Sequence, residues 1–447
     1  MARDLTNGPI LGHTIKLAIP AVLSMFALVA NNIINTALVG HLGDGPLAAV
    51  GSSMFVIWII FSLMDFFSVG TVAIVSQHYG AGELEQASRK AKEIFKFAIL
   101  FSIILCALGM IFSGKVIGLL NLEPEVERLG RTYVLIIFMA IPSLFLGEAV
   151  SSIFRAIGDT TTPMIIMITA VGSNIILDIL LIYGVWIFPR LEVAGAAIAT
   201  SIAHTIATIL ALIFVSRGKI PFEVFPKPSL ALDWKVIRQI FKIGFPISMA
   251  SVMFSVVYLV ITRIMSEFGT SAVASIPVGN RAESISFMTC FGFYLATSAM
   301  VGQNLGANKP ERAEKAAWAS AGIVTLITGF YGLIFYLFSE QIPAIFTQEP
   351  EVIKNAAMYL KILALSQIFM GYEIVLEGAF SGAGFTLPPM LISIPGTLLR
   401  IPIAYYLAIT LGMGPVGIFW AITISTIIKG IAIVIWFKAG TWKRKVI

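Results

Sequence analysis

The sequence predicts an all-α polytopic membrane protein with twelve transmembrane helices in two parallel six-helix repeats. Three observations lead to this class. Of the 447 residues, 58% are hydrophobic and only 12% are charged, whereas a soluble domain carries about 25% charged residues. Apolar stretches recur that are long enough to cross about 30 Å of hydrocarbon. One series of motifs also occurs twice along the chain.

The apolar stretches predict helices, because they are apolar on all sides and much longer than the alternating segments of about ten residues in a membrane barrel. We expect twelve spans, at residues 14–40, 48–78, 93–113, 129–155, 162–187, 194–216, 238–265, 273–302, 314–338, 354–382, 387–411 and 416–437. The two cysteines, Cys106 and Cys290, lie in separate apolar stretches, so we expect no disulfide, zinc site or cofactor.

The connections between spans predict the orientation in the membrane. Most basic residues fall on one side, among them Arg89, Lys90, Lys92, Arg155, Arg217, Lys219, Lys227, Lys235, Arg238, Lys443, Arg444 and Lys445. The other side collects Lys115, Arg128, Arg131, Arg190 and Lys354. Positive residues favour the cytoplasmic side, so both termini are expected in the cytoplasm of a multi-pass protein of the cell membrane. The net charge of +6 is therefore explained by basic loops on the cytoplasmic side, and we expect no nucleic-acid partner.

An internal duplication divides the chain. Segments match at one constant offset: 15–20 with 241–246, 77–81 with 303–307, 123–126 with 349–352, 154–158 with 380–384, and 163–164 with 389–390. Chance similarity between apolar helices does not keep one register through loops and prolines. We therefore expect an N-terminal lobe at 1–215, a linker at 216–236 and a C-terminal lobe at 237–447. An even number of spans per lobe makes the repeats parallel.

The motifs of the chain resemble those of the multidrug and toxic compound extrusion (MATE) family of cation-coupled efflux antiporters. The matching segments, in order, are Pro20, 39–43, 70–71, 77–82, 155–160, 174–178, 195–200, 283–288 and 301–307. The resemblance implies a V-shaped pair of six-helix lobes that exchanges Na⁺ or H⁺ for small cationic or amphipathic compounds. It also implies a transporter without a cofactor, and we expect a monomer.

Asp178 is the first candidate for the coupling residue, since a carboxylate in hydrocarbon is costly and most often functional. It lies about 15 residues, or roughly 22 Å, into the fifth span. Four further polar residues reach the same depth in the N-terminal lobe: Asn174, Thr200, Asn35 and Tyr133. Their oxygens could bind a small cation, with Asp178, Asn174 and Thr200 as possible Na⁺ ligands, or could support proton uptake by Asp178. The alternative is a polar network that only joins helices.

One position departs from the family pattern. Related transporters often carry an aspartate where this chain has Asn35, and an amide cannot exchange a proton although its carbonyl can bind sodium. Asp178 is therefore expected to be the only titrating group of the cluster. Asp65 in the second span lies too deep, at roughly 28 Å, to replace the missing carboxylate. It could line a substrate cavity, act as a relay, or be paired structurally.

The C-terminal lobe does not repeat the cation cluster, because Arg400 and Ala404 stand where the repeat has Asn174 and Asp178. Arg281, Glu283 and Arg400 lie near mid-depth. They form either a cavity wall that meets cationic substrates or, for Glu283 and Arg400, a buried ion pair. Glu373 and Glu377, near the inner end of the tenth span, are expected at a solvated cytoplasmic mouth. Pro20 and Pro246 begin the repeats, and we expect them to act as hinges.

Two other functions are possible for a membrane protein of this size. A lipid-linked precursor flippase of the same superfamily would favour a more cationic cavity and often additional spans. An integral-membrane prenyltransferase needs paired aspartate motifs to hold magnesium and diphosphate, and no span has that spacing apart from Glu373 and Glu377. No phosphate-binding loop is present either. We therefore expect a transporter and not an enzyme.

Overall fold

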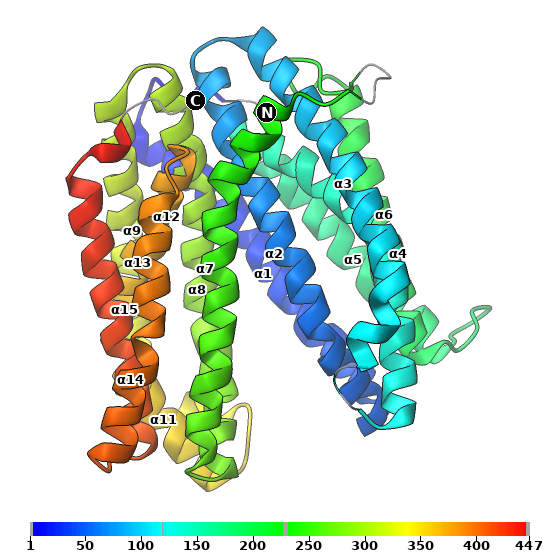
Figure 1. The fold of residues 1–447 in the computed structure, drawn as a ribbon, viewed down its shortest axis with the longest axis vertical. Coiled ribbons are helices and arrows are strands. Elements are labelled where there is room, and N and C mark those ends of the chain that lie inside the picture. The colour runs from blue at the N-terminus through cyan, green and yellow to red at the C-terminus, as the bar shows by residue number, and fades with distance from the viewer. Residues whose placement is uncertain (1–2, 119, 121, 227–230, 444–447) are drawn as a thin grey trace. The chain divides into compact units, whose positions relative to one another are not determined.

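The computed structural model describes residues 3–118, 120, 122–226 and 231–443, and within these ranges the chain is helical and without β-strands. Its contacts divide it into two compact units (Figure 1). The N-terminal unit comprises Leu23–Lys242 and the first residues up to Asp4, and the C-terminal unit comprises Leu5–Val22 and Ile243–Ile447. Residues 227–230 of the expected linker, and Lys227, Arg444 and Lys445 of the charge pattern, lie outside the described residues.

The first half of the chain forms six long helices. They are α1 (Ile10–Gly40), α2 (Asp44–Gly80), α3 (Leu84–Gly118), α4 (Pro124–Ala156), α5 (Thr161–Tyr183) and α6 (Glu192–Ser216). The second half forms α7 (Trp234–Ser266), α8 (Thr270–Gly306), α9 (Pro310–Leu337), α10 (Gln341–Ala344), α11 (Pro350–Ala364), α12 (Gln367–Gly382), α13 (Leu387–Leu398), α14 (Arg400–Tyr405), a π-helical turn (Tyr406–Thr410), α15 (Pro415–Lys438) and a 3₁₀ turn (Thr441–Lys443).

The helix lengths agree with the predicted spans. In the described residues eleven helices are long and apolar enough to cross a membrane, and the pair α11 and α12 brings the number to twelve when it is counted as one span. This pair covers the tenth span expected at 354–382, and it bends by 60° between Ala364 and Gln367. At the bend Ser366 bonds to Leu363 through both its amide and its hydroxyl, which tightens the turn and redirects the chain.

The duplication is visible in the helix boundaries. The starts of α2 and α8, of α3 and α9, of α4 and α11, and of α5 and α13 all keep the same separation along the chain. The loop before the last helix is shorter in the second repeat, so α15 begins earlier than the offset from α6 predicts. The twelve-helix fold with two repeats is thus confirmed. Insertions and deletions between the repeats fall in loops, where they cost little packing.

Two helices contribute to both units. The first part of α1, up to Val22, belongs to the C-terminal unit, and its remainder belongs to the N-terminal unit. The division in α7 falls between Lys242 and Ile243. By these contacts residues 5–22 group with the second half of the chain, and Lys242 is the last residue that groups with the first half. Pro20 and Pro246 lie inside these two helices, a few residues from each division.

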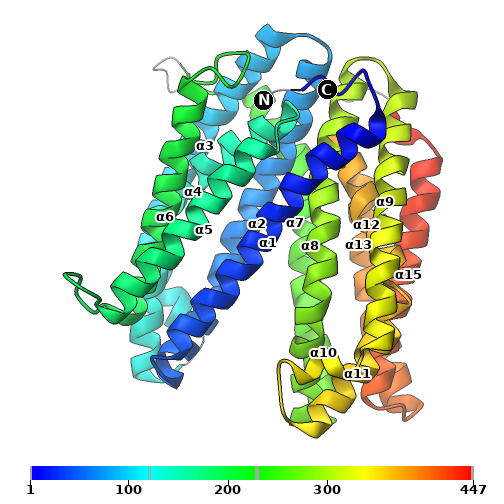
Figure 2. The ribbon, with the colours of Figure 1, turned by 180° about the vertical axis from the view of Figure 1, so that it is seen from behind.

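Each unit is a bundle around one central helix or helix pair. In the N-terminal unit α4 packs against α2, α3 and α6, and these helices run side by side in Figure 1. In the C-terminal unit α12 packs against α8, α9 and α15, which Figure 2 shows from behind. Apolar side chains fill the spaces between these helices, so the depth of a polar residue along its helix decides which other polar residues it can reach.

Close contact between α8 and α12 depends on glycine. A Cβ atom added at Gly378 would lie 2.6 Å from the carbonyl oxygen of Tyr294 in the facing helix, whereas a Cβ at Gly322 on α9 would meet no atom within 4 Å. Backbone atoms cannot move aside as flexible side chains do. Small residues let transmembrane helices approach this closely.

We predict that Gly378→Ala destabilises the C-terminal unit by about 1–3 kcal/mol through overpacking. Gly322→Ala is the matched control, because it gives the same gain in helix propensity at an open position. Thermal unfolding of both variants in detergent measures the difference. A Gly378→Ala protein as stable as the Gly322→Ala protein would show that α8 and α12 are less tightly packed than described.

Candidate cation-binding site

Five polar residues of the N-terminal unit, expected at one depth, come from four helices. Asn35 lies near the end of α1, Tyr133 in the first half of α4, Asn174 and Asp178 on α5, and Thr200 on α6. Asn174 and Asp178 are four residues apart and share one face of α5. The close approach of α5 to α6 is part of the geometry, since a Cβ at Gly195 would lie 2.5 Å from the Leu181 carbonyl oxygen.

Two hydrogen bonds connect members of this cluster. The Asn35 amide donates to Oδ2 of Asp178 over 3.1 Å, and the Asn174 amide donates to the Thr200 hydroxyl over 3.4 Å. Asp178 is fully buried, with 0% of its surface exposed, and Tyr133 is 3% exposed and close enough for the Asp178 charge to act on it. No basic side chain of the described chain forms an ion pair with Asp178. The carboxylate is therefore left with amide and hydroxyl neighbours only.

Two oxygens of the cluster have no hydrogen-bond partner. Oδ1 of Asp178 and Oδ1 of Asn174 are both buried and accept no hydrogen bond. A buried acceptor without a donor is costly, and a carboxylate without a counter-charge is more so. These two oxygens and the Thr200 hydroxyl are hard ligands of the kind that small cations prefer. A Na⁺ ion, or a proton on Asp178, would remove the cost.

Asp65 on α2 does not join this cluster. Its side chain is exposed and forms no hydrogen bond or ion pair in the described structure, so the paired alternative lacks a direct partner. Glu148 of α4, which was not among the predicted site residues, is instead paired with Arg155. The Arg155 guanidinium also donates to Ser68 over 3.0 Å and to Ser152 over 2.9 Å. The sequence did contain a signal for Glu148, because a carboxylate well inside an apolar span is costly and most often functional.

Arg155, which was predicted on the cytoplasmic side, is buried in the N-terminal unit. It is only 8% exposed and lies in the last turn of α4. In the second repeat the equivalent contact joins the Tyr294 hydroxyl and the Ser381 hydroxyl at 2.9 Å. Tyr294 and Ser381 stand at the repeat positions of Ser68 and Arg155. Both repeats therefore have a hydrogen bond between these two positions, from an arginine to a serine in the first repeat and between two hydroxyl groups in the second.

Glu283 and Arg400 do not form the direct ion pair that was one of the two expectations for the C-terminal lobe. Both are described, and no carboxylate oxygen of Glu283 lies within the 4 Å of an ion pair from the guanidinium. The Tyr359 hydroxyl is 3.2 Å from Oε2 of Glu283 and 2.9 Å from Oδ1 of Asn280. Arg400 donates to hydroxyl groups of α15. The two charges act on each other only through space.

Glu373 corrects another expectation, because it is not at a solvated mouth. Its side chain is buried, and its Oε1 atom accepts hydrogen bonds from Lys429 at 2.7 Å and from Ser393 at 3.2 Å. Lys429 of α15 is itself 5% exposed, and its role was missed. Glu377, one turn later, is half-buried. A buried pair of this kind neutralises both charges inside the bundle.

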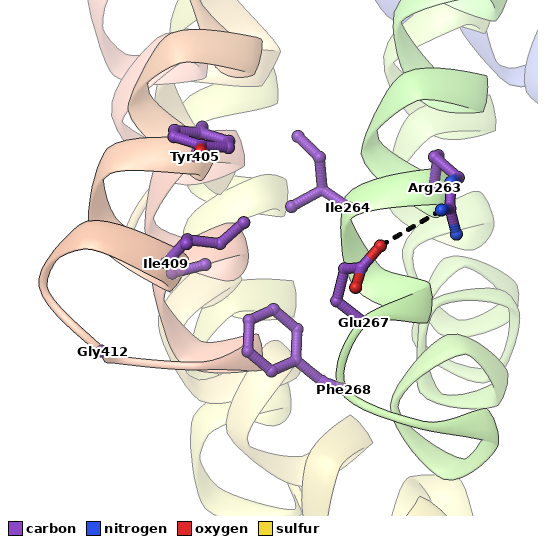
Figure 3. A pocket seen from close by; sticks show the side chains of 8 residues that line it. Arg263, Ile264, Glu267, Phe268, Tyr405, Ile409 and Gly412 are labelled. Carbon is purple, nitrogen blue, oxygen red and sulfur yellow. Dashed lines mark ion pairs between the residues drawn. The ribbon is translucent and has the colours of Figure 1, made fainter.

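The remaining candidate, Arg281, lies apart from Glu283 and Arg400. It is exposed, and its guanidinium lies 5.8 Å from the ring centre of Phe346. A surface pocket of about 580 Å³ lies elsewhere in the C-terminal unit, between the end of α7 and the π-helical turn. Figure 3 shows the Arg263–Glu267 ion pair at its rim and Tyr405 and Ile409 on the opposite wall. None of the predicted site residues lines it.

The described residues contain no group of three or more histidine, cysteine, aspartate or glutamate side chains that could hold a metal ion. The candidate Na⁺ ligands Asp178, Asn174 and Thr200 are a different kind of set, with one charge and two neutral oxygens.

Comparison with known proteins identifies relatives over nearly the full length. The chain is 28% identical to the probable multidrug resistance protein NorM of Thermotoga maritima over 441 residues, which are 97% of this chain and 93% of that protein. It is 26% identical to the probable multidrug resistance protein YoeA of Bacillus subtilis, over 96% of this chain and 93% of that one. It is 25% identical to the FAD transporter of Shewanella oneidensis, over 96% and 94% of the two chains.

Solved structures share the fold. A multidrug resistance MATE family transporter in an outward-facing conformation has a TM-score of 0.91 at 20% identity, covering 98% of this chain and 97% of that chain. A MOP superfamily transporter from Pyrococcus furiosus has a TM-score of 0.90, also at 20% identity and with the same coverage.

The sequence profile of one family matches the chain twice, at residues 20–180 and 246–406. The two matches keep the offset of the internal duplication, and together they include most of both six-helix halves. Proteins of this family are transporters, and the structural relatives have the same twelve-helix fold. The chain therefore belongs to the MatE family, the multidrug and toxic compound extrusion transporters that its motifs predicted, and it is a multi-pass membrane transporter and not an enzyme.

Proposed function

We propose that this protein is a secondary active antiporter that exports amphipathic and cationic small molecules in exchange for Na⁺ or H⁺. One observation carries the proposal: Asp178 is fully buried, has no basic partner, and lies beside acceptor oxygens that have no donor. A site built in this way is stable only when a cation or proton occupies it. The relatives named as multidrug resistance proteins support the export of drug-like compounds.

Coupling follows from the difference between the occupied and the empty site. Occupation neutralises Asp178 and changes the packing around it, and an ion that prefers one conformation shifts the equilibrium toward that conformation. Asn35 connects this event to α1, a helix that contributes residues to both units. We propose that the bend region at Pro20 transmits the change, with Pro246 as its counterpart in α7.

The orientation and assembly belong to the same proposal. The basic residues concentrate in the loops after even-numbered spans, which favours cytoplasmic termini in the cell membrane. Glu223 and Asp233 of the connection between the halves pair with Lys92 and Arg89 of α3. We propose a monomer, because each unit already contains the complete cation cluster or the complete set of buried charges that the mechanism uses.

The direct test is transport by purified protein in liposomes without nucleotide. An imposed Na⁺ or proton gradient should drive a fluorescent lipophilic cation such as ethidium against its concentration, and dissipating the gradient should stop it. Transport that needs neither gradient, or that needs ATP, would contradict the antiport mechanism.

Asp178→Asn should reduce ion-driven transport by at least about tenfold, since it removes the charge that makes occupation matter. The protein should remain folded, because an amide is less costly to bury than an unpaired carboxylate. Asp44→Asn, the same change at an exposed position at the start of α2, is the matched control. Normal transport with unchanged ion dependence in Asp178→Asn would exclude the cluster as the coupling site.

Asn35→Asp should raise the affinity for the coupling cation or shift the pH optimum, because it adds a second carboxylate next to Asp178. The measurement is the concentration of Na⁺, or the pH, that gives half-maximal transport. Asn31→Asp, one helical turn earlier on α1, controls for the added charge. Equal effects of both substitutions would show that the Asn35–Asp178 hydrogen bond is not the cause.

Pro20→Ala should lower the transport rate more than it lowers expression or thermal stability, since it restores a backbone hydrogen bond and straightens α1. Pro142→Ala is the matched control, because Pro142 lies inside α4, which belongs entirely to the N-terminal unit. If a well-expressed Pro20→Ala protein transports at the wild-type rate, Pro20 is not a hinge.

A further inference from the structure

Arg400 is a buried cation of the C-terminal unit that is held by hydroxyl groups. It is 3% exposed. Its Nε atom donates to the Ser425 hydroxyl over 2.7 Å, and its Nη2 atom donates to the Thr426 hydroxyl over 3.2 Å. Both hydroxyls in turn donate to the carbonyl oxygen of Ile422. Their lone pairs are thus free to orient the guanidinium, but they bring no negative charge.

The guanidinium has unused donors. An arginine carries five N–H groups, and the hydroxyls of Ser425 and Thr426 accept from two nitrogens only. The Nη1 atom is buried and has no hydrogen-bond partner. In the described chain no aspartate or glutamate oxygen lies within 4 Å of Arg400, because Glu373 pairs with Lys429 and Glu283 accepts from Tyr359. Arg400 therefore has no directly bonded carboxylate, and the buried Glu283 acts on its charge only through space. A buried guanidinium without a hydrogen-bonded counter-charge is costly.

The internal repeat shows that the polarity of this position is reversed. In the first repeat the equivalent helix carries Asn174 and Asp178, and in the second it carries Arg400 and Ala404. Both pairs are buried, and both positions face the last helix of their unit through a hydroxyl group, Thr200 in one and Thr426 in the other. The position that offers acceptor oxygens to a cation in one unit therefore offers N–H donors to an anion in the other.

Aromatic rings surround the guanidinium on the side of α7. Its central carbon lies 5.4 Å from the ring centre of Phe254 and 5.7 Å from that of Tyr258. The two rings are 4.6 Å apart. Phe254 is 38% exposed, so the ring that covers Arg400 is itself reachable from outside the packed core. A ligand that combines an anionic group with an aromatic body would satisfy both parts of this arrangement.

We propose that Arg400 forms a subsite for the oxyanion, a carboxylate or phosphate, of an amphipathic aromatic substrate, and that Phe254 moves aside to admit it. The inference rests on the proposed transport function and extends its substrates from cations to compounds with an acidic group. The oxyanion would accept from Nη1 and Nη2, while Ser425 and Thr426 hold the guanidinium plane. All of these residues belong to the C-terminal unit.

The test is isothermal titration of the purified full-length protein in phosphatidylcholine nanodiscs. Three probes share one aromatic body: 2-naphthoate carries a carboxylate, 2-naphthyl phosphate a phosphate, and 2-naphthamide no charge. The wild-type protein should bind at least one of the two anions. Arg400→Gln should weaken that binding by about tenfold or more and should change the affinity for 2-naphthamide by less than about twofold.

Two further variants keep the result interpretable. Arg263→Gln removes an exposed arginine of the same unit that pairs with Glu267, and it should leave all three affinities unchanged. Arg400→Lys keeps the charge and loses the planar fork, so it should bind the anion several-fold more weakly than the wild type. If thermal unfolding shows that Arg400→Gln does not fold, the anion affinity of Arg400→Lys tests the proposal in its place.

The outcomes separate this subsite from the coupling mechanism. Wild-type anion affinity in Arg400→Gln or Arg400→Lys, equal losses for the anions and the amide, or no anion binding by the wild type would each overturn the proposal. The titration uses no ion gradient and leaves Asp178 intact. An Asp178→Asn protein with normal ion-driven transport would refute the coupling site while leaving the anion measurement valid.

Discussion

The free-energy cost of a charge inside an apolar bundle shapes both units of this transporter. Glu148 and Arg155 meet this constraint as a direct pair supported by serine hydroxyls, and Glu373 and Lys429 meet it in the same way. Asp178 has no such partner and is nevertheless fully buried. A transporter can use this difference, because a site that needs an ion to be stable makes its conformation depend on that ion.

The two repeats use one scaffold for different chemistry. Their helix starts keep a constant separation, and the tyrosines Tyr133 and Tyr359 occupy equivalent buried positions. The polar residues near these tyrosines have diverged: the first repeat has Asn174 and Asp178, and the second has Arg400 and Ala404 at the equivalent positions, with Glu283 bonded to Tyr359. Because the apolar core carries most of the packing, polar residues at equivalent places can change without loss of the fold. The duplication thus supplied two equivalent positions whose side chains differ in charge.

Two helices contribute residues to both units. α1 and α7 each contribute residues to both units, and each contains a proline a few residues from the division. A proline removes one backbone hydrogen bond and lowers the cost of bending there. Within the C-terminal unit, α8 and α12 pack closely at Gly378, where a Cβ atom would lie 2.6 Å from the Tyr294 carbonyl oxygen.

The sequence by itself determined the helical membrane class, the twelve spans, the duplication and the family, because hydropathy and motif order are properties of the chain that do not depend on how helices are rotated. It also placed Asn35, Asn174, Asp178 and Thr200 at one depth, since depth follows from the rise per residue. Only the tertiary structure decided which side chains at one depth meet. It paired Glu373 with Lys429, separated Glu283 from Arg400, buried Arg155 and bent the tenth span. These outcomes depend on the rotation and tilt of neighbouring helices, which packing between distant segments sets and which no local pattern records.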